Sequence, residues 1–431
     1  MKIVDINKIF DVEVSLPGSK SESNRALMIC YYRGDFKGCK EGFEGLKSRI
    51  RNLSAADDTR LLAEILTNIS NGFYSSGQTA IDCHNAGTVL RFLVTALALR
   101  EGDYVLTGSD RMLQRPVGDL VDAMRMMGAD IEYLGREGFA PLKIHGRPNL
   151  LSSWLEKDGV LAVDITRSSQ FASSILLALP AMMAGKASRN VDSARGRATL
   201  RLMGELSSLP YIDMTLEVMR RYGAKVSREE RDIVVESSEY QNVDYVVEGD
   251  WSAASYWYEM VALSERGRAT LKNLHLDSAQ GDAVVAKLFE SLGVESMQCG
   301  NDVVISKHPD MAVNELKSVF LRYNFTDTPD LFPTIAATCA GLGIQTDFTG
   351  LRNLAIKESD RVAAMTAELS KIVPSSKTSQ IVFDSHNDHR IAMALAPLAM
   401  KIGALEIQNA EVVSKSYPDF WKEFQKFIPS R

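Results

Sequence analysis

Apolar residues follow a cycle along the chain in which helical runs alternate with short strand-like runs. One cycle begins with a helix predicted at 91–100 and continues with a strand at 103–108. A second helix, 117–127, ends at Gly128, where a left-handed residue is favoured, and the strand 129–134 follows. The recurrence of this order predicts a protein built from α/β units.

Polar or Arg-containing segments open the apolar helices at regular intervals. They lie near residues 24, 91, 170, 252, 332 and 390. Six such units predict two domains of three units each. Any α/β protein alternates in this way, but the shared Gly-Ala or Gly-Val helix endings favour a true repeat. No linker rich in Pro, Ser or Gly separates the halves, so the extended segment 239–249 is the best candidate for the crossing between them.

Composition narrows the class of protein. The 431 residues are 45% apolar and 24% charged, which is typical of a globular chain of two to four domains. A net charge of -6 disfavours a general nucleic-acid-binding surface. The 5 cysteines form no CxxC pair, and the longest apolar stretch, 175–185, is too short to cross a bilayer. We therefore expect a cytoplasmic protein with neither nucleic acid nor membrane as a partner.

The sequence lacks the common cofactor signatures. It contains no GxxxxGK[ST] and no GxGxxG after a predicted strand, so nucleotide hydrolysis and dinucleotide binding have no local support. His386 and His389 have a spacing that suits a metal, but no further His or Cys cluster completes such a site. We expect no metal and no cofactor.

Cations recur at the predicted helix starts. The segments are LPGSKSESNRAL (16–27), HNAGTVLRF (84–92), RMLQRPVGDL (111–120), RSSQF (167–171), TDTPD (326–330), IKESDR (356–361), NDHRIAM (387–393) and SKSYPDF (414–420). In these segments Asn85 is expected to cap a helix, and Arg115 with Pro116 to open another. Each alone is also typical of an ordinary helix start. A cation there opposes the helix dipole, so the set as a whole favours a shared site for a polyanion.

These motifs as a set resemble the 5-enolpyruvylshikimate-3-phosphate synthases. The motifs that carry the resemblance are LPGSKSESNRAL, NAGTVLR, RPVGDLVDAM, SSQF, SLPYIDMTL, TPDLFPT, NLAIKESDR, NDHRIAMALAPLA and SKSYPDF. They occur in the family's order between about Leu16 and Phe420, which is nearly the whole chain.

The resemblance implies an α/β fold of two similar domains, each of three βαβαββ units, with helix N-termini facing an interdomain cleft. Residues 16–242 would form the shikimate 3-phosphate-binding domain. Residues 1–15 and 243–431 would form the domain that completes the phosphoenolpyruvate site. The implied enzyme is a monomer that uses no metal and no organic cofactor.

The resemblance also implies the reaction and the residues that perform it. The enolpyruvyl group of phosphoenolpyruvate is transferred to the 5-hydroxyl of shikimate 3-phosphate, with release of phosphate, in chorismate biosynthesis. Shikimate 3-phosphate would be bound by Lys20, Ser21, Arg25, Ser168, Ser169, Ser208, Tyr211, Asp330, Asn353 and Lys357. Phosphoenolpyruvate would be bound by Lys20, Asn85, Gly87, Arg115, Gln170, Arg361, Arg390 and Lys415. The herbicide glyphosate would occupy the phosphoenolpyruvate site.

Proton transfer is assigned to three residues of this set. Asp330 is expected to be the base for the 5-hydroxyl, because its loop is expected to grip the ring. Glu358, beside Arg361, is expected to protonate the methylene carbon of phosphoenolpyruvate with the assistance of Lys20. The alternative is that both carboxylates only position substrate.

Several positions depart from the family pattern. Leu209, His84 and Phe92 replace residues common in the family, Arg167 adds a charge, and the segment 33–52 is longer and more charged. These departures bear on substrate affinity and on the response to glyphosate.

Two other functions stay open on the sequence alone. UDP-N-acetylglucosamine enolpyruvyl transferases share the fold and the donor, but they place a Cys in a mobile loop, and none of the cysteines here lies in a matching motif. A non-catalytic anion-binding protein is the second alternative. Asp330, Glu358 and Lys20 argue against it, because a binding protein needs neither an acid nor a base.

Overall fold

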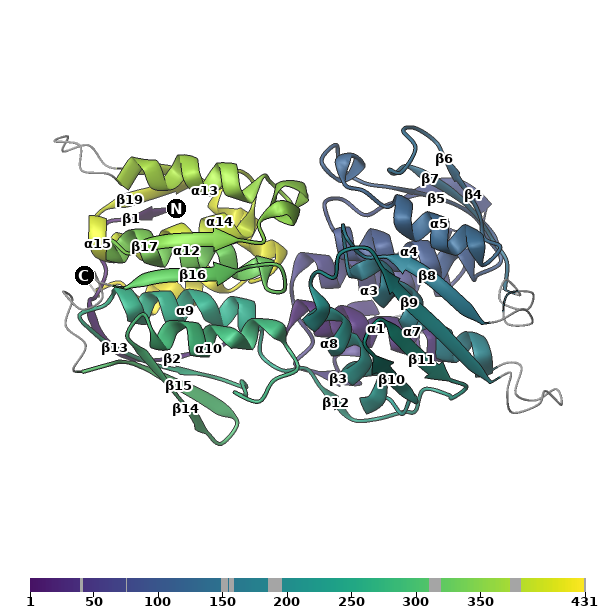
Figure 1. Cartoon of the computed structure of the whole chain (residues 1–431), viewed down its shortest axis with the longest axis horizontal. Helices are drawn as coiled ribbons and strands as arrows, with labels where there is room; N and C mark the ends of the chain where they lie inside the picture. The colour runs from purple at the N-terminus through teal and green to yellow at the C-terminus, as the bar shows by residue number, and fades with distance from the viewer. Residues whose placement is uncertain are drawn as a thin grey trace. The chain divides into compact units, whose positions relative to one another are not determined.

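A computed structural model describes residues 1–38, 42–74, 76–148, 154, 159–184, 196–309, 319–372 and 381–429 (Figure 1). The chain divides into two compact units. The inserted unit comprises Ser21–Leu53 and Asp58–Val247, and the terminal unit comprises Met1–Lys20, Ser54–Asp57 and Glu248–Arg431. These limits differ from the expected ranges at 16–20, 54–57 and 243–247.

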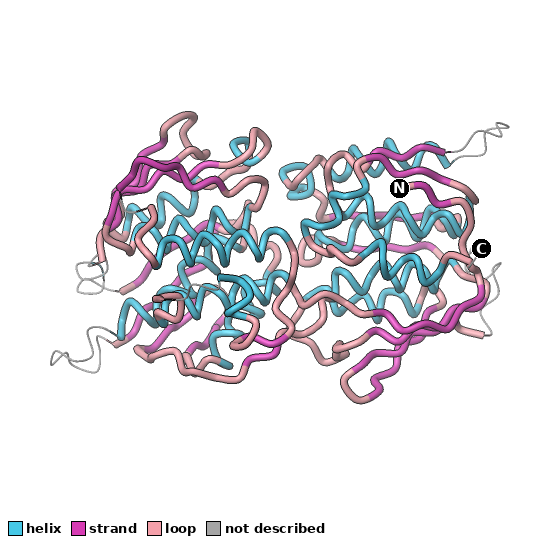
Figure 2. Tube along the Cα trace, turned by 180° about the vertical axis from the view of Figure 1, so that it is seen from behind, coloured by secondary structure: helices cyan, strands magenta, loops and turns pink. Residues whose placement is uncertain are grey.

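The inserted unit contains two four-stranded sheets of the same design among its described strands. Figure 2 shows the strands of the structure in magenta and its helices in cyan. The first has the order β4-β5-β7-β6, and the second has the order β8-β9-β11-β10. In each, the first two strands are parallel and the last two form an antiparallel hairpin. The strands are β4 (Ser76–Asp82), β5 (Gly102–Thr107), β6 (Asp130–Tyr133), β7 (Leu142–Gly146), β8 (Val160–Asp164), β9 (Arg197–Met203), β10 (Val226–Glu229) and β11 (Asp232–Glu236).

Helices follow the first and second strands of each of these sheets. They are α4 (Gly87–Ala98), α5 (Gly118–Met126), α7 (Gln170–Ala184) and α8 (Leu209–Arg221). The same unit holds α1 (Lys20–Arg33), α2 (Gly42–Leu46), α3 (Asp57–Ser70) and the short parallel pair β3 (Ile50–Arg51) and β12 (Tyr245–Val246). The first residues of α1 and α3 belong to the terminal unit. In β7 and β9, buried residues alternate with more accessible ones. One face of each sheet therefore packs against the core, because successive side chains of a strand point to opposite faces.

The terminal unit repeats this design with a strand from the chain's beginning. Its four-stranded sheet has the order β2-β13-β15-β14, with β2 (Ile9–Val14), β13 (Arg266–Leu271), β14 (Val294–Cys299) and β15 (Asp302–Lys307). β2 is parallel to β13, and β15 is antiparallel to both of its neighbours. Among the described strands, three sheets therefore share one order, which confirms the repeated α/β unit.

Smaller sheets and helices complete the terminal unit. The strands are β1 (Lys2–Ile3), β16 (Phe320–Asn324), β17 (Gln345–Thr349), β18 (Ile381–Asp384) and β19 (Leu405–Gln408). The helices are α9 (Trp251–Leu263), α10 (Val285–Glu290), α12 (Phe332–Leu342), α13 (Arg361–Leu369), α14 (His389–Leu395), α15 (Ala399–Ile402) and α16 (Phe420–Phe424). Among the described helices, none combines the length and apolarity needed to cross a membrane.

All six predicted helix openers lie in described helices, namely α1, α4, α7, α9, α12 and α14. Two local predictions are wrong. Ala86, not Asn85, occupies the N-cap position of α4. The apolar run 390–401 predicts one continuous helix, but this helix is broken at 396–398, because Pro397 has no backbone N–H to continue the α-helical pattern.

A buried acid lies in the core of the terminal unit. Glu259 on α9 is 0% exposed, and neither of its carboxylate oxygens has a hydrogen-bond partner among the described residues. Burial holds the pKa of Glu259 well above its usual range, so the side chain is neutral in the folded protein. An unsatisfied buried carboxyl group destabilises the fold.

Replacing this acid by an apolar residue of similar length is therefore expected to stabilise the protein. Glu259→Met should raise the free energy of unfolding by about 1–3 kcal/mol. Unfolded Glu259 ionises above about pH 4.3, so the wild type loses stability as pH rises past that value, and the variant should not. Thermal unfolding at pH 4.5 and 7 measures both effects. Glu290→Met, on the exposed side of α10, is the control; an equal gain there would contradict the burial argument.

Candidate functional site

Asp330 is the central carboxylate of a set of buried ion pairs in the terminal unit. Its Oδ1 accepts a hydrogen bond from Arg361 Nη1 at 2.8 Å, and its Oδ2 accepts one from Arg390 Nη2 at 2.7 Å. Lys357 Nζ lies 3.8 Å from Oδ1. Burial raises the pKa of Asp330, but Arg390, Lys357 and Arg361 outweigh burial and hold that pKa well below its usual range. The carboxylate is therefore ionised and weakly basic in this arrangement.

Glu358 bridges two cations next to this centre. Its Oε2 accepts from Arg361 Nη2 at 2.9 Å, and its Oε1 accepts from Lys415 Nζ at 3.1 Å. The side chains of Glu358 and Lys415 are 10% and 11% exposed, so both can still meet a small ligand. The structure thus brings together residues from four separate motifs.

Arg361 is held by three carboxylates at once. Besides Asp330 and Glu358, it donates from Nε to Asp388 Oδ2 at 2.8 Å. Burial opposes the charge of Arg361, but these three acids raise its pKa above the usual value and keep it protonated. Asp388 also accepts from the backbone N–H of Arg390 at 3.0 Å and caps α14. Sequence analysis did not single out Asp388, although its place two residues before Arg390 at a helix start was a usable signal.

The two histidines of the HNDH segment lie in different surroundings. His386 Nε2 is 3.0 Å from Glu368 Oε1, and His389 is 1% exposed. Burial, Lys20 and Arg390 hold the pKa of His389 well below its usual range, so its ring is neutral. Within the described residues, the one group of side chains spaced for a metal includes neither histidine.

Asp282 is a second buried acid near this centre that sequence analysis missed. Its Oδ2 accepts a hydrogen bond from Ser252 Oγ, and the residue is 4% exposed. Burial and the nearby Asp330 raise the pKa of Asp282 to about 7, and Arg390 lowers it. Asp282 therefore changes charge near neutral pH beside a proposed donor-binding arginine.

Lys20 is anchored to the terminal unit at the first residue of α1. Its backbone N–H donates to Asp250 Oδ2 at 3.1 Å, and Asp250 caps α9 through the N–H of Ala253 at 2.9 Å. The charge of Lys20 is near enough to lower the pKa of His389. Lys20 therefore lies in the neighbourhood of the Asp330 network. Asn353 lies in the short 3₁₀ segment Arg352–Ile356, directly before Lys357.

In the inserted unit, Gln170 is oriented at the start of α7. Its Oε1 accepts from Arg91 Nη1 at 2.7 Å, and its Nε2 donates to Thr88 Oγ1 at 2.8 Å. Arg91 also donates to the carbonyl of Pro116 at 3.2 Å. Arg91 is thus a positioning residue for Gln170, and it was noticed in the sequence only as a cation after a helix start.

Gly87 and Arg115 lie against each other. A Cβ atom at Gly87 would approach Cζ, Nη1 and Nη2 of Arg115 at 2.8 Å, closer than van der Waals contact allows. Arg115 is 7% exposed, and its Nη1 donates to the carbonyl of Asn85 at 3.4 Å. The guanidinium therefore fits only over a residue without a side chain.

Arg25 is buried inside the inserted unit, where protein groups accept its donors. It donates from Nε to Thr215 Oγ1 at 2.7 Å, from Nη1 to the carbonyl of Ser21 at 2.9 Å, and from Nη2 to the carbonyl of Tyr211 at 3.0 Å. Burial lowers the pKa of Arg25 to about 10, and Tyr211 and Glu22 partly offset this. Arg25 thus ties α1 to α8 and fixes Ser21 and Tyr211 relative to each other.

The predicted serines lie at helix starts. Ser168 Oγ accepts from the backbone N–H of Gln170 at 3.2 Å, and Ser169 is 4% exposed in the same turn. Ser208 is the N-cap residue of α8 in a left-handed conformation with φ 56°, and Tyr211 follows in the first turn. These residues place hydroxyls at helix N-termini, where the helix dipole favours an anion.

The departures from the family pattern have plain structural settings. Phe92 is 0% exposed in the core, with the Arg25 guanidinium 5.8 Å from its ring centroid. His84 is exposed in a left-handed turn with φ 47°. Leu209 packs against the core as the first residue of α8. Arg167 Nη1 lies 3.5 Å from Asp119 Oδ2 at the surface.

The described residues of the charged segment 33–52 belong to the inserted unit and pack apolar side chains into its core. Arg33 pairs with Asp35 at 3.2 Å, and Phe43 and Leu46 of α2 are buried. Residues 39–41 of this segment lie outside the described part of the chain.

Each unit therefore presents chemistry suited to an anion. The terminal unit supplies cations alternating with carboxylates that can take up or release protons, and the inserted unit supplies Arg115 with oriented hydroxyl and amide groups. Of the sequence-predicted residues, those joined into the terminal-unit network are Asp330, Lys357, Glu358, Arg361, Arg390 and Lys415.

Comparisons with known proteins find the same family of similar proteins along nearly the whole chain. The profile of the family described as "EPSP synthase (3-phosphoshikimate 1-carboxyvinyltransferase)" matches residues 4–424. A 3-phosphoshikimate 1-carboxyvinyltransferase of Bacteroides fragilis is 36% identical over 96% of this chain and 94% of its own length. One from Vibrio cholerae is 33% identical over 96% of each chain. The structure of EPSP synthase from Acinetobacter baumannii has the same fold, with TM-score 0.67 and 21% identity over 99% of this chain and 97% of that one.

Proposed function

The chain belongs to the EPSP synthase family, and from this membership we propose which of its residues perform the family's reaction. That reaction transfers the enolpyruvyl group of phosphoenolpyruvate to the 5-hydroxyl of shikimate 3-phosphate and releases phosphate, a step in aromatic amino acid biosynthesis. Its two substrates are both multiply charged anions, so binding requires cations.

One observation carries the assignment of roles in the terminal unit. Asp330, Glu358, Arg361, Arg390 and Lys415 come from four motifs spread over the last third of the chain, yet they form one hydrogen-bonded network. A structural core does not need acids and cations interleaved in this way, whereas a site that binds phosphate and moves protons does.

In the proposed mechanism Asp330 accepts the proton of the 5-hydroxyl. Its lowered pKa reflects the charges of Arg390, Lys357 and Arg361. When the phosphate and carboxylate of phosphoenolpyruvate engage Arg390, they neutralise part of that charge, and the pKa of Asp330 rises toward that of a useful base. Both oxygens of Glu358 accept hydrogen bonds from cations here, so Glu358 must first take up a proton, which Lys20 supplies as the assisting group. Glu358 then delivers this proton to the methylene carbon and later takes it back.

The remaining residues are proposed to bind the substrates. Arg361, Arg390, Lys415, Lys20, Arg115, Gln170, Asn85 and Gly87 are assigned to phosphoenolpyruvate. Ser21, Arg25, Ser168, Ser169, Ser208, Tyr211, Asn353, Lys357, Lys20 and Asp330 are assigned to shikimate 3-phosphate. We also propose that the enzyme is monomeric and cytoplasmic and binds no nucleic acid; the described cysteines Cys30, Cys83, Cys299 and Cys339 are free thiols, as a reducing compartment favours.

A phosphate-release assay tests the reaction itself. Phosphoenolpyruvate with shikimate 3-phosphate should release phosphate, and mass spectrometry should detect the enolpyruvyl product. UDP-N-acetylglucosamine in place of shikimate 3-phosphate should release none. Release with the nucleotide sugar alone would instead assign the chain to the sister activity, and release with neither acceptor would favour a binding protein.

Arg390→Ala is expected to weaken binding of the donor, phosphoenolpyruvate, more than binding of the acceptor, shikimate 3-phosphate. Loss of a charge pair with a buried arginine costs about 2–5 kcal/mol. Because 1.4 kcal/mol is about a tenfold change, kcat/KM for phosphoenolpyruvate should fall at least about thirtyfold. Binding of shikimate 3-phosphate alone, measured by calorimetry, should stay nearly unchanged. Arg268→Ala, which removes an exposed arginine paired with Asp11, is the control; a collapse of acceptor binding in Arg390→Ala would overturn the assignment.

Gly87→Ala is expected to displace Arg115, because the new Cβ would lie 2.8 Å from the guanidinium. The KM for phosphoenolpyruvate should rise, and the inhibition constant for glyphosate should rise more, whereas kcat should change least. Gly135→Ala is a matched control in the same unit, since a Cβ there meets only Pro141 Cδ at 3.6 Å. Equal glyphosate inhibition of the wild type and Gly87→Ala would place this loop away from the ligand.

A further inference from the structure

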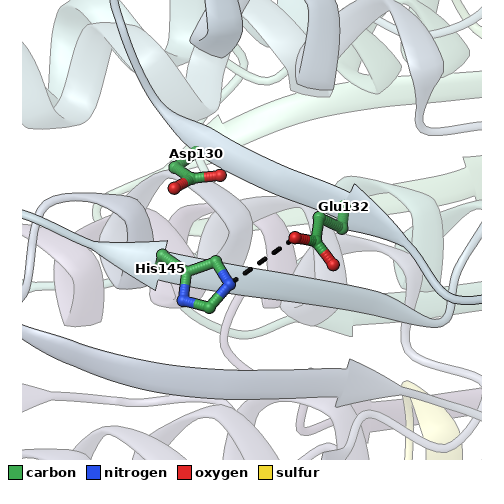
Figure 3. A group of neighbouring side chains, drawn as sticks. All are labelled: Asp130, Glu132 and His145. Carbon is green, nitrogen blue, oxygen red and sulfur yellow. Dashed lines mark ion pairs between the residues drawn. The ribbon is translucent and has the colours of Figure 1, made fainter.

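Outside the proposed site, acidic and imidazole side chains gather on the exposed face of the sheet β4-β5-β7-β6. His145 on β7 stands opposite Asp103 on β5 and opposite Asp130 on the edge strand β6. Glu132 lies two residues after Asp130 and therefore on the same face. Figure 3 shows the side chains of Asp130, Glu132 and His145 on neighbouring strands, with the imidazole directed at Glu132.

The imidazole of His145 is oriented by Asp103. Nδ1 lies 2.5 Å from Asp103 Oδ1, so in the neutral ring the proton sits on Nδ1 and the lone pair on Nε2. Nε2 lies 3.8 Å from Glu132 Oε1, which is too long for a hydrogen bond. A histidine whose other nitrogen donates to a carboxylate is the usual arrangement behind a metal ligand.

We propose that Asp130, Glu132 and His145 bind one divalent transition-metal ion, with zinc as the best-suited ion and Asp103 as the outer residue that orients His145. The three ligand atoms lie within 4.8 Å of one another. Bonds of about 2.1 Å around a tetrahedral ion place ligand atoms about 3.4 Å apart, so the two carboxylates must move inward. The side chains of Asp130 and Glu132 are 43% and 57% exposed, which leaves them free to do so.

The donor set selects the class of metal. One imidazole with two carboxylates suits zinc and its neighbours in the first transition row, whereas magnesium and calcium prefer oxygen alone. Arg147 Nη2 lies 3.1 Å from Asp130 Oδ2, but this pair is exposed and weak, and it leaves Oδ1 for the ion. A water molecule fills the fourth position.

The proposed ion has a structural role. The ion links β6, which is the edge of its sheet, to β7, and it takes no part in the enolpyruvyl transfer. None of the residues proposed for that reaction belongs to this cluster, so failure of one proposal leaves the other standing.

Zinc titration of the chelator-treated full chain by calorimetry tests the proposal. We expect one site that His145→Ala and Glu132→Gln each weaken by at least about tenfold, because loss of an outer residue alone typically costs 10–100-fold. Asp103→Asn should weaken zinc binding by about 10–100-fold, because Asp103 is such an outer residue. His308→Ala is the matched control, since His308 is a half-exposed histidine whose Nε2 lies 3.1 Å from Glu295 Oε1; this variant should bind zinc as the wild type does.

Cobalt provides an independent readout. Visible absorption bands from bound Co²⁺ should appear in the wild type and in His308→Ala and be absent in His145→Ala. All variants should keep wild-type enolpyruvyl transfer, which shows that they are folded. No saturable zinc binding in the wild type, or equal zinc affinity in the wild type and His145→Ala, would overturn the proposal.

Discussion

Asp330→Asn is expected to lower kcat by at least about 10², the smaller end of what a general base contributes. The amide keeps the shape of the side chain but cannot accept the proton of the 5-hydroxyl. Its NH₂ group must also face Arg361 or Arg390, both of which now donate to the carboxylate. The loss should appear in steady-state phosphate release at saturating concentrations of both substrates.

Two measurements separate loss of the base from loss of the site. Calorimetric binding of shikimate 3-phosphate to Asp330→Asn should persist, and the far-ultraviolet spectrum should match that of the wild type. Asp347→Asn, which removes an exposed carboxylate paired with Arg322 in the same unit, should keep the wild-type kcat. A near-wild-type kcat in Asp330→Asn would mean that this carboxylate only positions the substrate.

Glu358→Gln is expected to lower kcat by a factor of at least about 10². It should also slow hydrogen exchange at the methylene carbon of phosphoenolpyruvate. The glutamine can still accept a hydrogen bond from Lys415 or Arg361, so the network loses a proton donor more than it loses shape. Nuclear magnetic resonance in deuterated water should show slower entry of deuterium into the methylene of phosphoenolpyruvate. Entry at the wild-type rate would transfer the role of acid to Lys20.

The control for this change is a second buried, ion-paired glutamate. Glu368 is 2% exposed and pairs with Lys371 and His386 at the far end of α13. Glu368→Gln also removes one negative charge from this part of the chain, but Glu368 has no proposed role in binding or converting the substrates. It should leave kcat and deuterium entry close to those of the wild type, even if it lowers stability.

The features that could be predicted from the sequence depend on local patterns. The helices α4 and α7 follow from apolar runs after a polar start, and Gly128 adopts the left-handed conformation with φ 99° that the pattern predicted for it. The residues of the Asp330 network were named because each lies in its own short motif. Such features depend on neighbours within a few positions, which a sequence displays directly.

Pairings across the fold were not predictable in the same way. Asp388 orients Arg361 from 27 residues away, and Asp282 reaches Ser252 from another segment. Asp103 and His145 are 42 residues apart and meet only because β5 and β7 pair in one register. The cap predicted at Asn85 was also wrong, because Ala86 occupies that position and caps α4 without a side-chain hydrogen bond.

The pairing of β2 with β13 bears on how the protein is made. Asp11 and Arg268 contact each other across 257 residues, so during synthesis β2 waits for β13, which is made much later. At 5–20 residues per second, that delay is about 13–50 s. Meanwhile the nascent segment from Ser21 to Val247 holds the whole inserted unit and can fold. Asp11 and Glu13 alternate along the waiting strand, and their charge discourages it from pairing with other nascent chains before Arg268 and Lys272 emerge.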